Sequence, residues 1–395
     1  MNKLILPSLL FTLLFSCQSP QKEFTSFQDD VDFLRQYVDD LTVLKKGEAL
    51  MAVSPSWQGR VFTTSLDGEN GRSLGYYNQK LFKVGKADQQ LSKAGGESRM
   101  WFGPEVGDFS IFFPPNVEQV GENMKVSADL DTLKFNTDET SNKQVIASND
   151  MVIENAYGTS FTIHASRSIE LFDVKTIEKN LGIQLQNGDK KSIGFETNTI
   201  IKNTGNTTWS KDTGLLPIWI LGCFHPSEKQ WAIVPTNSSE LDTVTNYFTD
   251  QTGRVMIKKG VAFYKVDAGY LNKMGLPQKH IRPIMGSYSP EMNLLNIVVY
   301  SFDSDPNLLY VNSEWGKENN YDGDVMNIFN GEINLPLDRD WPFYEFESFS
   351  AAKELQPGEE LQHKQSVYHF EGSKEELTPI AEQLLGVSLF DAPFN

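Results

Sequence analysis

The sequence predicts a mainly β protein, an antiparallel β-supersandwich with an amphipathic helix at its N-terminal end and a short helix at its C-terminal end. Short apolar runs rich in β-branched and aromatic residues recur from residue 47 to residue 370, separated by turn signals such as DG, NG and TG. No stretch between them has the pattern of a crossover helix, and the chain has no internal repeat. A sandwich is therefore favoured over a propeller.

A helical pattern leads the domain. In FQDDVDFLRQYVDDLTVL, residues 27–44, apolar side chains recur at helical spacing, and Asp29 and Asp30 stand in the opening turn, where negative charge suits the helix dipole. We therefore expect one amphipathic helix here. No linker rich in Pro, Gly or Ser interrupts residues 26–395, which predicts a single domain.

A second helix is expected near the C-terminus. In GSKEELTPIAEQLLG, Ser373 and Glu376 have the spacing of a capping box, and Gly386 is a candidate end. Pro379 makes a start at Thr378 an equal alternative.

The first residues predict export. Lys3 precedes an apolar run over residues 4–15, which has the length of a signal-peptide core and is too short to span a bilayer as a helix. The string LFSC resembles a bacterial lipobox, so residues 1–16 are expected to be removed and Cys17 to carry a lipid, with residues 17–25 as a tether. A plain secretory signal is the alternative. The expected location is the cell envelope, as an outer-membrane lipoprotein that faces the periplasm or the cell surface.

Composition excludes several classes of partner. The formal net charge is −17, so no surface suited to nucleic acid or to anionic lipids is expected, and membrane contact is expected only through the N-terminal lipid. With Cys17 lipidated, Cys223 is the remaining cysteine, so no internal disulfide can form and the fold depends on its core. Aromatic residues make up 12% of the chain, which fits both a β-rich core and sugar binding. We expect a monomer with a carbohydrate ligand.

Two glutamates near the end of the chain are candidate catalytic groups. Alternation along a strand sends Glu345 and Glu347 to one face and Tyr344 and Phe346 to the other. The two carboxylates then lie about 7 Å apart. In a pocket, their repulsion and partial desolvation would raise one pKa and give a base and an acid. On a solvated strand face they would have no such role.

The stretch AGGESRMWFGPE, residues 94–105, is expected to be a loop that holds a ligand. A sugar presents apolar C–H faces beside hydroxyl groups, so Trp101 could supply a platform while Arg99 and Glu105 supply hydrogen bonds. The alternative is a structural ion pair between Arg99 and Glu105, with Trp101 in the core.

A further polar cluster lies in YDGDVMNIFNGE, residues 321–332. Its members suit sugar hydroxyls or an oxygen-coordinated calcium ion, and Asp324 and Asn327 are expected to bind the substrate. Asp303 and Asp305 could add calcium ligands. The spacing does not match an EF-hand loop, so no metal and no other cofactor is expected, and turn chemistry alone is an alternative explanation.

Two histidines follow the PGEE turn on one strand. His363 and His369 point the same way, and either could donate a proton. We expect His369 to contact the substrate. A place at the surface or at the rim of the site is the alternative for both.

The end of the chain resembles aldose 1-epimerases and their galactose-mutarotase-like relatives. The resemblance rests on an L-x-P-G-E turn at residues 355–359, on a following strand that ends Y-x-F, and on a preceding strand that carries a glutamate. In that pattern the glutamate before the turn is the general base, which implies this role for Glu347, with Glu345 beside it. Residues 52–61 and 94–105 resemble the opening strand and the glycine-glycine-arginine rim near the sugar.

The chain more closely resembles the DUF6786 family, which comprises bacterial lipoproteins of unknown function with the same supersandwich fold. Four strings carry this resemblance in order: F-x-x-D-V-x-F-L, G-G-E-x-R-x-W-x-G-P-E, G-D-V-x-N and Y-E-x-E-S. They stand here at residues 27–34, 95–105, 323–327 and 344–348. The resemblance implies the galactose-mutarotase-like fold for nearly the whole chain.

The paired histidine strings of the mutarotases, N-H and H-x-Y-F-N, are absent here. His164 and His225 lack the surrounding pattern, so the general acid is not assigned. Three functions are therefore considered: a mutarotase-type isomerase, a glycan-binding or glycan-cleaving lipoprotein of a polysaccharide-utilisation system, and a structural lipoprotein. We expect an exported protein that binds or processes carbohydrate, with isomerisation by a glutamate base as its possible reaction.

Overall fold

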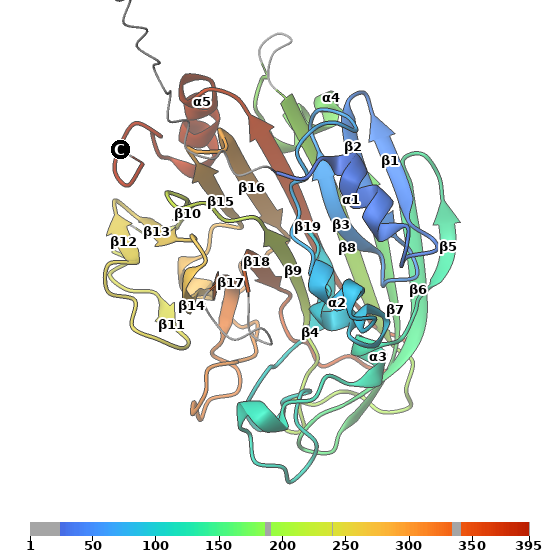
Figure 1. Ribbon diagram of the computed structural model, residues 1–395. Helices are drawn as coiled ribbons and strands as arrows, with labels where there is room; N and C mark the ends of the chain where they lie inside the picture. Colours follow the sequence, from blue (N-terminus) through green and yellow to red (C-terminus); the bar gives the residue numbers. More distant parts are fainter. Residues whose placement is uncertain (1–23, 186–190, 239, 334–340, 395) are drawn as a thin grey trace, which may run out of the picture.

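The computed structural model describes residues 24–185, 191–238, 240–333 and 341–394 (Figure 1). The expected signal peptide and the lipidation position Cys17 lie outside these residues. Within the described ranges, no helix is long and apolar enough to cross a membrane.

The larger layer of the structure is an antiparallel sheet of ten strands. Its order across the sheet is β12 (Val255–Lys258), β13 (Val261–Lys265), β10 (Trp231–Pro235), β15 (Ile284–Ser289), β16 (Leu294–Tyr300), β19 (Glu360–Glu371), β8 (Lys191–Asn203), β7 (Ser160–Leu171), β6 (Gln144–Glu154) and β5 (Asn136–Thr140).

A six-stranded antiparallel sheet forms much of the second layer. Its order is β11 (Thr245–Asn246), β14 (Gly269–Pro277), β17 (Asp324–Glu332), β18 (Tyr344–Phe349), β9 (Ile218–Phe224) and β4 (Arg99–Phe102). One face packs on the ten-stranded sheet: the Tyr344 hydroxyl of β18 lies 2.8 Å from Ser287 Oγ of β15. The prediction of a mainly β, antiparallel sandwich is confirmed.

A three-stranded sheet extends this second layer. It consists of β1 (Thr42–Lys46), β2 (Ala49–Ser54) and β3 (Arg60–Ser65), and a bridge between Val61 and Ser98 joins it to the segment before β4. β1 and β2 contact β7 and β8 of the large sheet. Helices α1 (Phe27–Leu34) and α2 (Gln79–Lys83) cover this part of the fold (Figure 1).

The leading helix is shorter than predicted. Ser26 caps α1 through a capping box with Asp29, as an acidic first turn favours, but the helix ends at Leu34, and residues 42–46 form strand β1. Asp40 explains the change of direction, because its carboxylate accepts hydrogen bonds from Ser54 Oγ at 2.5 Å and from Ser56 N at 2.6 Å. The apolar residues beyond the helix remain buried without helical backbone.

The closing helix is confirmed, with the capping-box start. In α5 (Lys374–Leu385), Ser373 Oγ accepts from Glu376 N at 3.3 Å, and Gly386 ends the helix in the left-handed conformation at φ 71°. The alternative start at Thr378 is wrong, and Pro379 lies inside the helix.

The sequence analysis misses α4 (Val174–Leu181) between β7 and β8. The remaining short helices are α3 (Ala128–Asp131) and the 3-10 turns Ala87–Gln89, Leu91–Lys93, Gly121–Asn123 and Gln278–His280. The apolar run DFSIFF, residues 108–113, is not a strand, although Ile111, Phe112 and Phe113 are buried in the core.

Candidate functional site

Strand register places several of the predicted site residues on one face of the six-stranded sheet. Arg99 pairs with Leu221, Leu221 with Glu347, and Glu347 with Asn327. Residues directly opposite one another in an antiparallel sheet point to the same face. Tyr344 and Phe346 point the other way into the inter-sheet core, as predicted, so Arg99, Asn327 and Glu347 share the outer face.

The stretch predicted as a loop is partly an edge strand. Residues 99–102 form β4, in which Met100 and Phe102 are buried in the core while Arg99 and Trp101 take the opposite face. The alternation R-M-W-F is therefore a strand pattern, and the loop prediction is wrong at these residues. Glu105 lies beyond the strand.

Glu347 is the most enclosed of the predicted catalytic residues. Its side chain is 1% exposed, and its Oε2 accepts a hydrogen bond from Trp219 Nε1 at 3.1 Å and lies 2.9 Å from Lys273 Nζ. Burial raises the pKa of Glu347 to about 7, against the opposing charge of Lys273. Both of these contacts involve Oε2, and among the described residues no hydrogen bond to Oε1 is found.

Glu345 is held differently. Arg99 Nη2 lies 2.8 Å from Glu345 Oε1, and the same oxygen accepts from Cys223 Sγ at 3.0 Å. Burial raises the pKa of the Cys223 thiol well above its usual value, so the thiol remains protonated and can donate. The alternative of an ion pair between Arg99 and Glu105 is wrong, because the partner of Arg99 is Glu345.

Lys273 is a central residue that sequence reasoning missed. The side chain is only 4% exposed, and its ammonium group lies 4.8 Å from the ring centroid of Trp219 and 5.1 Å from that of Tyr247. Glu105 Oε2 is 4.0 Å from the same nitrogen. Lys273 thus stands between two carboxylates and two aromatic rings, which offset the cost of burying its charge.

Asp324 and Asn327 meet on the same outer face. Asp324 accepts hydrogen bonds from Tyr247 Oη at 2.9 Å and Thr245 Oγ1 at 3.1 Å, and Asn327 Nδ2 donates to Tyr247 Oη at 3.1 Å. Burial raises the pKa of Asp324 to about 7. Their segment is strand β17, so the explanation by turn chemistry alone is wrong from Asp324 onward.

Gly275 makes this arrangement possible. A Cβ atom at Gly275 would lie 2.0 Å from Asp324 Oδ2 and 2.3 Å from Asn327 Nδ2, closer than any real Cβ contact. The missing side chain therefore leaves the space that the two polar groups fill.

Three polar atoms of this face lack partners among the described residues, and one of them is Arg99 Nε. Asn327 Oδ1 and Trp101 Nε1 are both buried and make no hydrogen bond there. The ring of Trp101 is half-buried and lies under the Arg99 guanidinium at 4.4 Å. An acceptor and a donor without partners suit a ligand hydroxyl or an ordered water.

The protein-family comparison extends over almost all of the domain. A model described as "Family of unknown function (DUF6786)" matches residues 25–393. The chain belongs to the DUF6786 family. No curated protein sequence matches the chain. The resemblance that the motifs indicated is thereby confirmed.

Solved structures with a similar chain path include two proteins of Lactobacillus. A galactose mutarotase related enzyme from Lactobacillus acidophilus has 9% identity and a TM-score of 0.49, with 84% of this chain and 98% of that chain covered. A galactose mutarotase-like protein from Lactobacillus casei has 10% identity and a TM-score of 0.45, with 83% and 99% covered. Similarity at this level assigns neither an activity nor a site.

The G-G-E-x-R string of this DUF6786 protein contributes side chains to both sides of the six-stranded sheet. Arg99 contacts Glu345 on the outer face, whereas Glu97 lies on the core side and accepts from Thr64 Oγ1 at 2.9 Å. His369 Nε2 lies 3.1 Å from Glu97 Oε2, and His369 Nδ1 lies 2.7 Å from Asn296 Oδ1.

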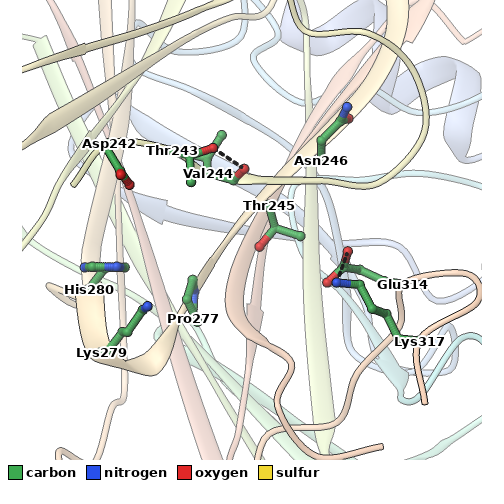
Figure 2. A pocket seen from close by; sticks show the side chains of 10 residues that line it. All are labelled: Asp242, Thr243, Val244, Thr245, Asn246, Pro277, Lys279, His280, Glu314 and Lys317. Atoms are coloured by element: carbon green, nitrogen blue, oxygen red, sulfur yellow. Dashed lines mark hydrogen bonds and ion pairs between the residues drawn. The ribbon is translucent and has the colours of Figure 1, made fainter. Parts of the chain in front are cut away.

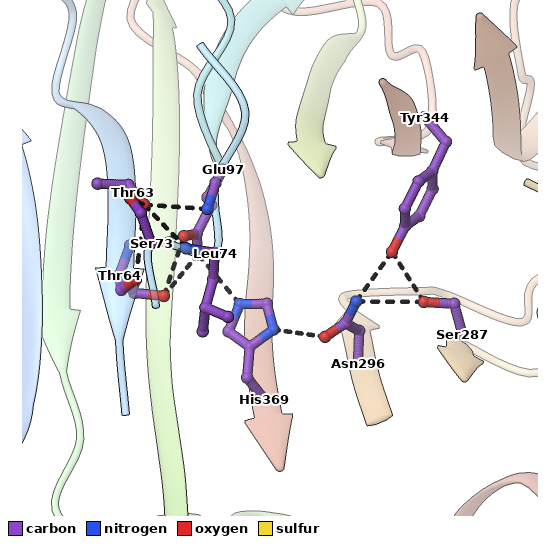
Figure 3. Close-up of polar contacts among 10 residues, drawn as sticks. Thr63, Thr64, Ser73, Leu74, Glu97, Ser287, Asn296, Tyr344 and His369 are labelled. Atoms are coloured by element: carbon purple, nitrogen blue, oxygen red, sulfur yellow. Dashed lines mark hydrogen bonds and ion pairs between the residues drawn. The ribbon is translucent and has the colours of Figure 1, made fainter. Parts of the chain in front are cut away.

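A polar network therefore runs through the core between the sheets (Figure 3). It continues from Asn296 to Tyr344 Oη at 2.8 Å, and His369 is fully buried within it, on the opposite side of the six-stranded sheet from Glu347. His363 is also buried in this core, where its Nε2 lies 2.8 Å from Ser348 Oγ and burial lowers its pKa to about 3. Neither histidine lies on a rim.

The carboxylates considered as calcium ligands have hydrogen-bond partners within the protein. Within the described ranges, no group of three or more His, Cys, Asp or Glu side chains could hold a metal ion. Asp322 accepts from Asn312 Nδ2 at 2.7 Å and so links two segments, whereas Asp305 accepts from Asn307 Nδ2 at 2.8 Å within its own turn.

A pocket of about 330 Å³ lies beside this face at the edge strand β11 (Figure 2). Its lining includes Thr245 and Asn246 of that strand, Pro277 at the end of β14, and Glu314 of a neighbouring segment. Thr245 also donates to Asp324, so the pocket wall directly contacts the polar cluster.

Sequence signals for the missed residues are weak. Lys273 is the single charged residue of its strand, GYLNKMGLP, and Trp219 lies in the apolar run PIWILGCF. Each fits an ordinary strand, and only the register of β9, β14, β17 and β18 reveals their contact with Glu347.

Proposed function

We propose that the outer face of the six-stranded sheet binds a carbohydrate and that Glu347 acts there as a general base in a mutarotase-type isomerisation. The observation that carries this proposal is the state of Glu347: one oxygen is fixed by Lys273 and Trp219, no residue that the structure describes bonds the other, and the pKa is about 7. A base with this pKa can take and return a proton at neutral pH.

The surroundings of Glu347 suit a sugar. The half-buried ring of Trp101 offers a flat apolar surface, while Asn327 Oδ1 and Trp101 Nε1 offer an acceptor and a donor without partners. Stacking against a ring and hydrogen bonding to hydroxyls are the two kinds of contact that a pyranose requires. The resemblance of the C-terminal motif to aldose 1-epimerases points to the same glutamate.

The reaction would proceed by ring opening. Glu347 takes the proton of the anomeric hydroxyl, a carbonyl forms at C1, and the bond from C1 to the ring oxygen breaks as that oxygen gains a proton. Among the groups of this face that carry protons near neutral pH, two are candidate donors: the Lys273 ammonium, whose pKa is raised by Glu347 against the effect of burial, and Asp324, with a pKa of about 7. Rotation about the C1–C2 bond and reclosure give the other anomer.

The test is acceleration of mutarotation by purified protein, followed by polarimetry with freshly dissolved α-glucose and α-galactose. Glu347→Gln should reduce the rate to that of buffer while the unfolding midpoint stays close to the wild-type value. Glu170→Gln, at an exposed position on β7, is the matched control and should retain full activity. Equal rates for wild type and Glu347→Gln, both above buffer, would exclude Glu347 as the base.

Binding without turnover is the second candidate, and the ion pair favours it. Lys273 holds Glu347 at 2.9 Å, and an ionised carboxylate held in this way is a weaker base. Saturable sugar binding by calorimetry with no change in mutarotation rate would establish this function instead. Cleavage by a Glu345 and Glu347 pair is disfavoured, because Arg99 and Cys223 both engage Glu345 and the two glutamates lie on one strand.

We further propose export and lipid attachment at Cys17, on the basis of the N-terminal sequence. Expression of the full chain with labelled palmitate should label the wild type, and Cys17→Ser should remove the label and release the protein from the membrane fraction. Release without any label on the wild type would indicate a plain secretory signal.

A further inference from the structure

Glu347, Lys273, Tyr247, Asp324 and Asn327 form one polar cluster on the outer face. A continuous set of aromatic side chains adjoins it. The aromatic band is defined here as Tyr76, Phe248, Phe329, Trp341 and Phe343. Neighbouring ring centroids lie 4.8 Å apart for Tyr76 and Phe343, 5.7 Å for Phe343 and Phe329, 5.9 Å for Phe329 and Trp341, and 6.4 Å for Phe329 and Phe248. Phe248 in turn lies 6.4 Å from Tyr247 of the polar cluster.

Strand register places the band beside the two glutamates. Phe329 pairs directly with Glu345 and with Lys273, so the three side chains share one face. Phe343 is two residues before Glu345 and therefore points to the same side. Since rows along a strand are about 7 Å apart, the band begins one row beyond Glu347 and extends to about 14 Å from it. A single sugar held at Glu347 does not reach that far.

The band is not part of the closed core. Phe248 is 44% exposed, and the other four members are half-buried. Isolated exposed aromatic residues are common on soluble proteins, but a contiguous set next to a polar cluster marks a binding surface. The rings pack on one another, stacked for Tyr76 and Phe343 and edge to face for Phe329 with its neighbours Trp341 and Phe248. They form a continuous apolar surface, which suits the apolar faces of successive sugar units.

The charged groups of the outer face indicate whether it suits a neutral or an acidic glycan. Arg99 is paired with Glu345 and Lys273 with Glu347, which leaves Glu105 and Asp324 as further acidic groups. Among these described groups no positive charge is left in excess for a row of uronate groups. The chain as a whole carries a formal net charge of −17, which also disfavours the binding of an acidic glycan.

We propose that this site binds a neutral oligosaccharide, with one terminal sugar at Glu347 and the following units stacked on the aromatic band. This inference rests on the proposed function and extends it from a free monosaccharide to a glycan chain. In this mode of binding the polar cluster contacts the terminal sugar unit, which reacts or is anchored there. The aromatic band contacts the following units, so the affinity increases with the length of the glycan.

Titration calorimetry of the wild type tests it with glucose, galactose, mannose and xylose and with cellotetraose, galactotetraose, mannotetraose, xylotetraose and tetragalacturonate. At least one neutral tetrasaccharide should bind tenfold or more tightly than its own monosaccharide, and tetragalacturonate should bind more weakly. Phe248→Ala and Trp341→Ala should each lower the tetrasaccharide affinity by about threefold to tenfold and leave the monosaccharide affinity unchanged. Tyr157→Ala, at a position 61% exposed and distant from the band in the chain, is the matched control and should bind like the wild type.

The outcomes separate the two proposals. Monosaccharide binding that depends on Glu347, without a gain from chain length or an effect of the two band variants, overturns the oligosaccharide inference and leaves the proposed function standing. Preference for tetragalacturonate overturns the assignment to neutral glycans. Absence of binding by every saccharide, with all variants folded, overturns both proposals.

Discussion

Lys273 Nζ and Glu347 Oε2 lie 2.9 Å apart, and their side chains are 4% and 1% exposed. The pair joins strands β14 and β18, which are separated in the sheet by β17. A charge pair so deeply enclosed contributes little net stability, but removal of one partner leaves the other charge buried alone. The pair therefore makes both stability and pKa values at this face sensitive to single substitutions.

Lys273→Met should destabilise the protein by about 3 kcal/mol at pH 8. Without the ammonium group the pKa of Glu347 rises further, so the loss should shrink at pH 5, where Glu347 is protonated. Urea unfolding at both pH values measures the difference. Lys202→Met, which removes an exposed pair with Glu360, should change stability by less than about 0.5 kcal/mol. An equal loss for Lys273→Met at both pH values would contradict the expectation.

Asp324 should make stability fall as the pH rises. Burial raises its pKa from 3.8 in the unfolded chain to about 7 in the folded protein, so the folded state binds the proton more tightly. The contribution is fully present below about pH 4 and is lost as the pH rises through about 7, with a total on the order of 4 kcal/mol. Asp324→Asn should flatten the pH dependence of the unfolding free energy over this range. An unchanged slope would show that Asp324 titrates normally.

The mutarotation rate should follow the ionisation of Glu347. Because the base form is needed and the pKa is about 7, kcat/KM should rise about tenfold per pH unit below pH 7. Above pH 7 it should level off if Lys273 is the acid and fall again if Asp324 is the acid. Polarimetry between pH 5 and pH 9 gives the profile. A rate that is flat across this range would point to a group other than Glu347.

Gly275→Ala should disturb the site from within strand β14. The added methyl group meets Asp324 Oδ2 at 2.0 Å and Asn327 Nδ2 at 2.3 Å, so both side chains must move. We expect a stability loss of about 1–3 kcal/mol and at least tenfold weaker sugar binding, by urea unfolding and calorimetry. Gly121→Ala, where nothing lies within 4 Å of the new atom, is the control and should be neutral. Normal binding by Gly275→Ala would separate Asp324 and Asn327 from the ligand.

His369→Leu should act on stability. Its ring bonds to Glu97 and Asn296 in the inter-sheet core, so the variant leaves a buried carboxylate without one partner and should cost about 2 kcal/mol. Sugar affinity measured by calorimetry should stay within a factor of two of the wild type. A large loss of affinity in a folded variant would instead support the substrate contact that the sequence predicts.

Local patterns in the sequence predicted much of the fold. Alternation placed Glu345 and Glu347 on one face of β18, and the pair Ser373 and Glu376 located the start of α5, because such patterns depend on neighbours within a few residues. The same reasoning extended the first helix too far, since Asp40 turns the chain by bonding to Ser54 and Ser56 more than ten residues away.

The sequence by itself determined the β architecture, its two terminal helices, the family, and the shared face of Glu345 and Glu347. The tertiary structure alone decided their partners: Arg99 for Glu345, Lys273 and Trp219 for Glu347, and a place in the core for His369. The physical reason is that periodicity fixes only which face of its own strand a side chain takes. The contacts between faces depend on the order and register of strands that come from distant parts of the chain.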